Sequence, residues 1–197
     1  MPEETLNLIS AFAALAGVAF GAFAAVRALQ DLRRAREQSD RDYRWRQAQA
    51  AKQLSDELLA AEPARFALTM LDWERREYTY NGKEYGGFSD ADVALALRTQ
   101  LVHPQELDSK TLVFDENEVF IRDAFDEFLG FLERFEHFIS VDLTTLQDLR
   151  HPVDYYIAKM AQPKFKPAIQ EFLTTYGYHG ALSFCDRFPV WHPEQEG

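Results

Sequence analysis

One long run of uncharged positions lies near the start of the chain. The run from Thr5 to Val26 contains 22 residues and no charged side chain. As a helix it would be about 33 Å long, which matches the hydrocarbon thickness of a bilayer, about 30 Å. Because a segment in lipid must satisfy its own backbone hydrogen bonds, we expect one transmembrane helix over residues 5–26. Two other interpretations stay open: a cleaved signal peptide, favoured by the small residues Ala22 and Ala24, and a buried core helix.

The charges that flank this run predict its orientation. Glu3 and Glu4 precede it. Four arginines follow closely: Arg27, Arg33, Arg34 and Arg36. Basic side chains beside a membrane segment stay in the cytoplasm, where they meet anionic headgroups. We therefore predict a single-pass protein of the bacterial inner membrane, with the lipid bilayer as one partner. The N-terminus lies outside, and the rest of the chain lies in the cytoplasm.

Small residues recur at every fourth position of the run. They are Ala13, Gly17, Gly21 and Ala25. Such a stripe lets transmembrane helices approach closely, so we expect a homo-oligomer that associates through this face. A pore-forming oligomer is one function that follows from such association. The alternative is that Ala and Gly are simply abundant in this segment.

The pattern of the remaining chain is mainly helical. Nothing breaks a helix between Arg27 and Ala61, so the membrane helix should continue as a stalk. A narrow apolar stripe marks its end, at Ala51, Leu54, Leu58 and Ala61. Its middle is too polar for a strong coiled coil. The predicted organisation is an anchor at 1–31, a juxtamembrane stalk at 32–62, a helical cytoplasmic domain at 63–189 and a tail at 190–197.

Within the cytoplasmic domain, three signals stand out. Asn81-Gly82 between β-favouring residues predicts a small two-stranded hairpin. Ser89 predicts the start of a helix that ends near His103, because a proline follows. The strongest helical periodicity covers Asp115 to Ile139, and so many aromatic rings on one face predict the central core helix. Further helices are predicted at 63–77, 142–150, 152–161, 165–176 and 180–188, with a loop at 104–114.

Composition supports a packed domain and narrows its partners. Apolar residues make up 47% of the chain, with 16 Phe, which is more than a disordered chain carries. The net charge is -11, and residues 53–197 hold 26 acidic against 13 basic side chains. This charge repels phosphate, so it disfavours nucleic acid as a partner. Cys185 is the only cysteine, so no internal disulfide forms, and we expect a buried, inert thiol.

One pair of residues is a candidate for catalysis. Arg98 and His103 form an Arg-x4-His motif, which resembles the short motif of HEPN-type ribonucleases. The resemblance implies that the histidine acts as acid and base on a ribose hydroxyl while the arginine steadies phosphate charge. The competing interpretation places Arg98 on a solvated helix face and His103 in a turn. The acidic composition favours the second interpretation.

A second candidate is a weak metal site on the strongest predicted helix. Asp126, Glu133 and His137 lie near one line along this helix, and carboxylate and imidazole groups bind divalent metals. The competing interpretation is an ordinary pair of neighbouring side chains on the helix surface. The sequence has no glycine-rich phosphate loop, no Cys-x-x-Cys pair and no Gly-x-Ser-x-Gly elbow, so we predict no cofactor.

Three stretches resemble a family of small uncharacterised bacterial membrane proteins. They are LDWERREYTYNGKEY at 71–85, IRDAFDEFLGFLERFEHFI at 121–139 and the YG…AL.F..RF ending at 176–188. That family has one N-terminal anchor followed by a helical domain of unknown function. The arrangement of an anchor followed by a helical domain also resembles that of HEPN-like transmembrane accessory proteins of RNA-targeting CRISPR systems, which form membrane oligomers.

These patterns together predict a membrane-tethered helical interaction or oligomerisation module, with an unidentified cytoplasmic protein as partner. The strong anchor and the missing active-site motifs favour a protein without chemistry of its own. The alternative is an RNA-directed effector that uses Arg98 and His103, or a pore-forming accessory protein in a defence system.

Overall fold

The computed structural model describes residues 3–191, without the side chains of residues 3–19, 22, 104, 108 and 152. The chain divides into two compact units, Met1–Arg46 and Gln47–Gly197. The fold is mainly helical with one two-stranded hairpin, which confirms the predicted class. The elements are α1 (Glu3–Ala60), α2 (Glu62–Asp72), β1 (Glu77–Tyr80), β2 (Lys83–Gly86), α3 (Asp90–Ala96), α4 (Pro104–Ser109), α5 (Glu116–Ser140), α6 (Leu146–Met160), α7 (Lys166–Tyr176), α8 (His179–Asp186) and the 3-10 helix η1 (Pro189–Trp191).

The first unit holds most of α1. In the part of the chain that the structure describes, no helix contains a stretch apolar and long enough to cross a membrane. The span predicted at 5–26 is therefore not supported by the structure, and most of its side chains lie outside the described residues. The transmembrane anchor remains a prediction from the sequence.

The end of α1 belongs to the second unit. Ala51, Leu54 and Leu58 are each no more than 2% exposed, which confirms the predicted apolar stripe. Their burial places residues 47–60 in the packed domain, although we expected this segment to form part of a stalk. The reason is that apolar side chains on one face of a helix gain free energy only when another element covers them.

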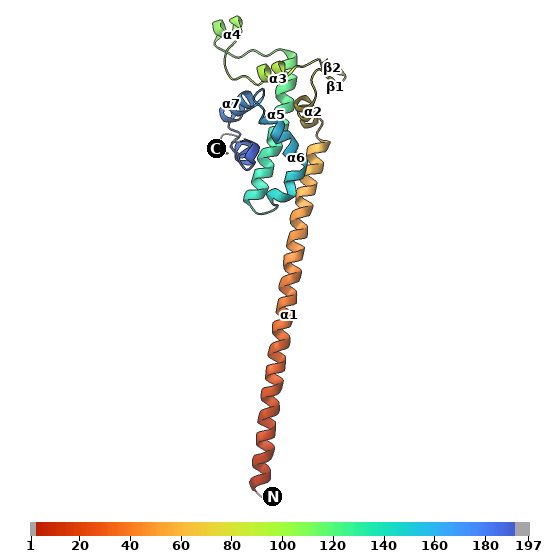
Figure 1. The fold of residues 1–197 in the computed structure, drawn as a ribbon, viewed down its shortest axis with the longest axis vertical. Helices are drawn as coiled ribbons and strands as arrows, with labels where there is room; N and C mark the ends of the chain where they lie inside the picture. Colours follow the sequence, from red (N-terminus) through yellow and green to blue (C-terminus); the bar gives the residue numbers. More distant parts are fainter. Residues whose placement is uncertain (1–2, 192–197) are drawn as a thin grey trace. The chain divides into compact units, whose positions relative to one another are not determined.

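Helix α5 is the centre of the second unit, as its periodicity predicts. Its N-terminus is capped by Asp115, whose carboxylate accepts the backbone N–H of Glu118 at 2.8 Å. Phe125, Phe128 and Phe135 are fully buried. Helices α2, α3 and α8 pack against it (Figure 1). Each neighbour covers part of an apolar face that runs the length of α5.

The hairpin forms at the predicted turn. Strands β1 and β2 pair antiparallel, with Tyr80 opposite Lys83. Asn81 has φ 51° and Gly82 has φ 76°, so both turn residues adopt the left-handed conformation that a two-residue hairpin turn requires. The hairpin packs on the N-terminal half of α5 through the ring of Tyr85, which stacks on Phe120.

Several predicted boundaries are wrong. The helix predicted at 63–77 ends at Asp72, and residue 77 already belongs to β1. Helix α3 ends at Ala96 instead of near 102, because Arg98 turns inward to buried acceptors. The loop predicted at 104–114 contains α4, since a proline is also well suited to the first turn of a helix. The two helices predicted at 142–150 and 152–161 are one helix, α6. Its buried residues Leu149, Val153 and Ile157 lie on both sides of residue 152, so burial offsets the cost of a proline within the helix, about 3 kcal/mol.

Two adjacent leucines of α1 test whether its end belongs to the domain. Leu58 is 1% exposed and Leu59 is 50% exposed. We expect Leu58→Ala to lower the free energy of unfolding by about 2–5 kcal/mol, because it leaves a cavity in the core. The matched control Leu59→Ala should change it by less than about 0.5 kcal/mol. Urea unfolding followed by circular dichroism measures both, and equal small effects would place residues 47–60 outside the packed domain.

Candidate functional site

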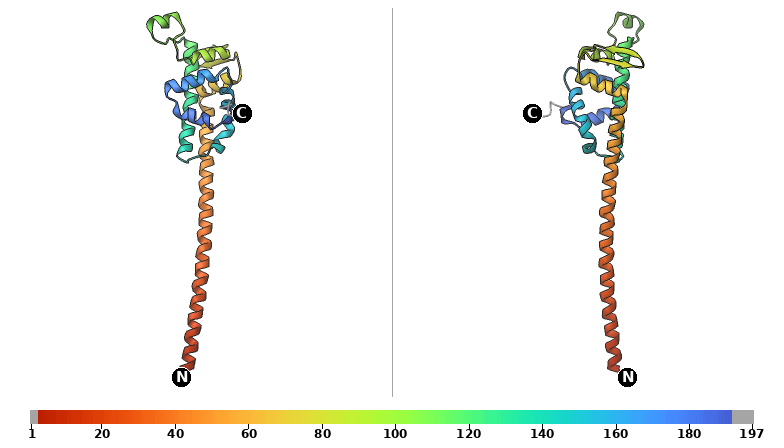
Figure 2. Two further views of the ribbon diagram at one scale, coloured as in Figure 1. Left: turned by 60° about the vertical axis from the view of Figure 1, so that its left-hand side comes forward. Right: turned by 90° about the vertical axis from the view of Figure 1, so that its right-hand side faces the viewer.

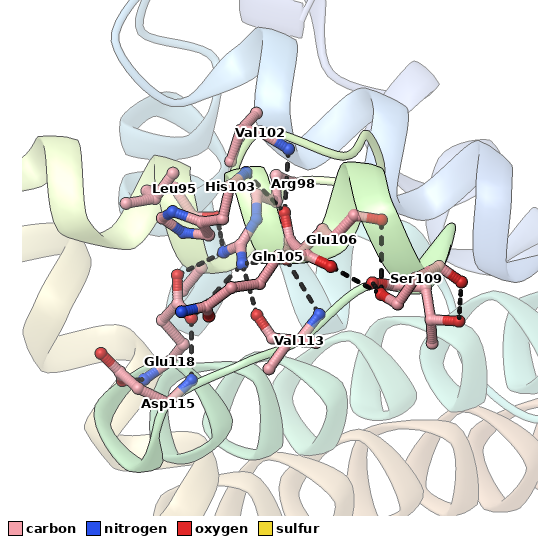
Figure 3. Close-up of polar contacts among 12 residues, drawn as sticks. Leu95, Arg98, Val102, His103, Gln105, Glu106, Ser109, Val113, Asp115 and Glu118 are labelled. Carbon is pink, nitrogen blue, oxygen red and sulfur yellow. Dashed lines mark hydrogen bonds and ion pairs between the residues drawn. The ribbon is translucent and has the colours of Figure 1, made fainter.

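The guanidinium of Arg98 lies in a buried cluster with two carboxylates (Figure 3). The side chain of Arg98 is 6% exposed and that of Glu106 is fully buried. Nη2 donates to Glu106 Oε1 and to the carbonyl of Val113, each at 2.8 Å. Nη1 donates to the carboxylate of Glu118 and to the carbonyl of Leu95, the latter at 3.0 Å. Both terminal nitrogens are therefore occupied by acceptors of the protein itself.

The carboxylate of Glu106 accepts hydrogen bonds on both oxygens. Oε2 accepts the backbone N–H groups of Val102 at 2.8 Å and His103 at 2.9 Å. Oε1 accepts the backbone N–H of Val113 at 2.9 Å in addition to Arg98. Burial by itself raises the pKa of Glu106, but these hydrogen bonds outweigh burial and hold the pKa well below its ordinary value of 4.5. Glu106 is therefore ionised at neutral pH.

This cluster attaches α4 to the rest of the domain. Helix α4 lies at one end of the second unit in every view (Figures 1 and 2). Among the described side chains of α4, Glu106 alone is buried, and Leu107 is 58% exposed. Arg98 links Glu106 to Glu118, which belongs to α5. Ion pairing therefore holds α4 to the domain, whereas burial of apolar side chains holds the other helices.

The Arg-x4-His motif is split between two environments. Arg98 is buried, so the expectation of a solvated helix face is wrong. Its Nε is also buried and has no partner among the described residues. His103 is the N-cap residue that precedes α4, and it lines a cavity of about 250 Å³ together with Asp92 and Asp115. In this conformation the guanidinium that would steady a phosphate is bonded to carboxylates, which compete with any phosphate for it.

The three candidate metal ligands each have a different environment. Asp126 accepts a hydrogen bond from the hydroxyl of Tyr178. Glu133 Oε1 accepts the backbone N–H of Gly180 at 2.8 Å, in the first turn of α8, and His137 is exposed. Within the described residues, no group of three or more His, Cys, Asp or Glu side chains is placed to hold a metal ion. Glu133 instead stabilises the N-terminus of α8, where carboxylates are favoured.

The small-residue stripe is described only in part. Ala13 and Gly17 lie outside the residues whose side chains are described. Gly21 and Ala25 are exposed on α1, and a Cβ added at Gly21 would meet no described atom within 4 Å. Oligomerisation through this stripe therefore stays a prediction.

The single thiol is buried, as the sequence analysis predicted. Cys185 is fully buried in the core, and burial raises its pKa to about 12. A thiol with that pKa stays protonated at neutral pH, and it is a poor nucleophile because the thiolate is the reactive form.

A cavity that the sequence analysis did not predict lies between α2, the hairpin and the first half of α5. Its volume is about 620 Å³. Five aromatic side chains form its walls: Phe66, Tyr80, Tyr85, Phe114 and Phe120. The rings of Tyr85 and Phe120 stack with centroids 4.1 Å apart, and Phe66 meets Tyr80 edge-on at 5.7 Å. The sequence signal that could have indicated this cavity was the presence of tyrosines on both predicted strands and of many phenylalanines on one predicted helix. Only the tertiary structure brings these residues together.

The rim of this aromatic cavity is acidic. Four carboxylates and one ammonium group line it: Glu116, Asp123, Asp126, Glu127 and Lys83. Lys83 pairs with Glu116, and its Nζ lies 5.4 Å from the centroid of the Tyr85 ring. Their side chains are 47% and 81% exposed, so this ion pair is weak. The side chains of Asp123 and Glu127 are exposed, and their carboxylates have no hydrogen bond or ion pair within the described part of the chain.

Comparison of the chain with protein-family models, with curated proteins and with solved structures finds no match.

Removing the buried cation tests the role of the Arg98 cluster. We expect Arg98→Met to lower the free energy of unfolding by about 3–5 kcal/mol, because it leaves Glu106 and Glu118 buried without a cation. The control Arg150→Met removes an exposed arginine, paired with Asp154 four residues later. It should change the free energy by less than about 1 kcal/mol. Urea unfolding curves measure both, and similar small effects would show that the cluster does not hold the domain together.

The lowered pKa of Glu106 predicts a loss of stability in acid. The unfolded state takes up a proton near pH 4.5 while the folded state keeps this carboxylate ionised. Its contribution is therefore complete at pH 7 and is lost as the pH falls below about 5. We expect Glu106→Gln to lower the melting temperature at pH 7 and to flatten its decline between about pH 5 and pH 3. Leu59→Ala, which keeps every titratable group, should retain the wild-type slope, and an unchanged slope in Glu106→Gln would contradict the prediction.

Proposed function

We propose that this protein is a membrane-tethered helical interaction module without catalytic chemistry of its own. The aromatic cavity with its acidic rim carries this proposal. Sites that recognise a ligand are concave and combine apolar walls with placed polar groups, and this cavity has aromatic walls and a charged rim. Arg98, the residue best suited to phosphate chemistry, already donates to Glu106 and Glu118.

The sequence of the first unit supports the tether. The run at 5–26 is uncharged, and a cluster of arginines follows it. Large apolar side chains that the structure does describe in this unit are 53–79% exposed: Phe20, Phe23, Val26, Leu29 and Leu32. Apolar side chains exposed together mark a surface that contacts lipid or another protein. We place the N-terminus outside the bacterial inner membrane and the second unit in the cytoplasm.

Self-association is the second part of the proposal. Gly21 and Ala25 leave the described surface of α1 open, and Ala13 and Gly17 continue the same interval in the sequence. Small side chains at this spacing let two helices in a bilayer pack closely. Several copies in one membrane would present several aromatic cavities to a partner, which raises the overall affinity without new contacts.

One experiment tests both the tether and the interaction. We expect the tagged full chain to stay in the membrane pellet after an alkaline carbonate wash, and a variant that begins at residue 27 to be released. From membranes solubilised in non-ionic detergent, the full chain should capture a protein that Tyr80→Ala fails to capture, because this variant removes a wall of the cavity.

The control for capture is Tyr155→Ala, which removes an exposed tyrosine from α6. It should capture the same protein as the wild type. If carbonate releases the full chain, the protein is not anchored in the membrane. If Tyr80→Ala captures the protein as well as the wild type does, the aromatic cavity is not the interaction site.

A further inference from the structure

We propose that the aromatic cavity takes an arginine or lysine side chain presented by a basic segment of a partner protein. This inference rests on the proposed function and specifies the ligand of its interaction site.

The walls suit a cation. The faces of aromatic rings carry negative electrostatic potential, so an ammonium or guanidinium within about 6 Å of a ring centroid is attracted. Phe120 lines the cavity and is 6% exposed, while Tyr80 and Tyr85 are half-buried and remain accessible. The cavity volume of about 620 Å³ accommodates a long side chain together with part of its backbone.

The rim neutralises a cation and disfavours other ligands. Asp123 and Glu127 lie four residues apart on α5, so their carboxylates project from the same helix face. Because neither carboxylate has a partner within the described residues, a bound cation can pair with both of them without displacing another cation from either. A phosphate would be repelled, and an uncharged ligand would partly desolvate these carboxylates without pairing them.

The chain itself places a cation at this position. Lys83 Nζ approaches the ring of Tyr85 and the carboxylate of Glu116 at the edge of the cavity. This contact shows that the rings and carboxylates already provide an environment for an ammonium group. Since the pair is largely exposed, an incoming side chain can displace it. Lys83 therefore competes with the ligand, and its removal should strengthen binding.

Binding of a labelled octapeptide of alternating glycine and arginine to the full chain in non-ionic detergent tests the proposal. We expect saturable binding by fluorescence anisotropy, weakened about tenfold in the variant Asp123→Asn/Glu127→Gln. Both side chains are exposed, so the fold is expected to persist. The control Asp40→Asn/Asp42→Asn removes two charges from exposed positions on α1 and should bind within about twofold of the wild type.

Lys83→Gln provides a change in the opposite direction. We expect it to bind the arginine peptide about three to five times more tightly than the wild type, because it removes the competing charge. The control Lys52→Gln likewise removes an exposed lysine that is paired with a carboxylate, here that of Asp56. It should leave the affinity unchanged. Equal tightening in both variants would attribute the effect to net charge and would overturn the role of Lys83.

Several outcomes would overturn the proposal. Equal loss of affinity in the two double variants would mean unspecific attraction to an acidic protein, and equal binding of a glycine–glutamine octapeptide would mean that charge is not recognised. Binding of a choline lysolipid that depends on Glu127, without binding of the peptide, would replace the basic protein segment by a lipid headgroup. If the arginine peptide does not bind while Tyr80→Ala still fails to capture the partner, the proposed function is retained and the assignment of a basic ligand is wrong.

Discussion

Burial of the apolar face of α5 is the constraint on which the second unit depends. A 25-residue helix with six phenylalanines cannot expose that face to water, since burying each large apolar side chain contributes about 1.5–3 kcal/mol. Helices α2, α3 and α8 and the hairpin cover successive parts of it. The end of α1 joins the same core through Leu54 and Leu58, which extends the domain beyond the stalk boundary that the sequence suggested.

Helix α4 buries little apolar surface, and ion pairing holds it to the rest of the domain. Among the side chains of α4 that the structure describes, only that of Glu106 is buried. Its carboxylate accepts hydrogen bonds from Arg98 and from three backbone N–H groups. A buried ion pair contributes little net stability compared with a well-packed apolar core, but it is specific, because losing one partner leaves the other charge buried. The Arg98 cluster therefore determines how residues 97–115 fold back on α5 more than how stable the domain is.

The aromatic cavity arises from the same constraint. The hairpin covers the first half of α5 through stacked rings and not through interlocking aliphatic side chains, and a cavity remains beside Phe120. Carboxylates that lie on the solvent side of α5 then become its rim. A feature that serves packing on one face of the helix thus supplies both the aromatic walls and the charge on which the proposed recognition of a basic segment rests.

Local signals in the sequence determined much of the fold. Periodicity identified α5, and the Asn81-Gly82 turn identified the hairpin. These signals depend on backbone preferences and on the spacing of apolar residues, both of which act over a few positions. The uncharged run at 5–26 and its arginines are of the same kind, and they still support the anchor by themselves.

Only the tertiary structure decided the chemistry of the polar groups. Arg98, judged from its neighbours in sequence, suited either phosphate binding or a solvated face, and it is buried between Glu106 and Glu118. Glu133, a candidate ligand, caps α8, and the aromatic cavity brings together residues from positions 63 to 127. The physical reason is that the free energy of a charge depends on which groups surround it, and those groups come from distant parts of the chain.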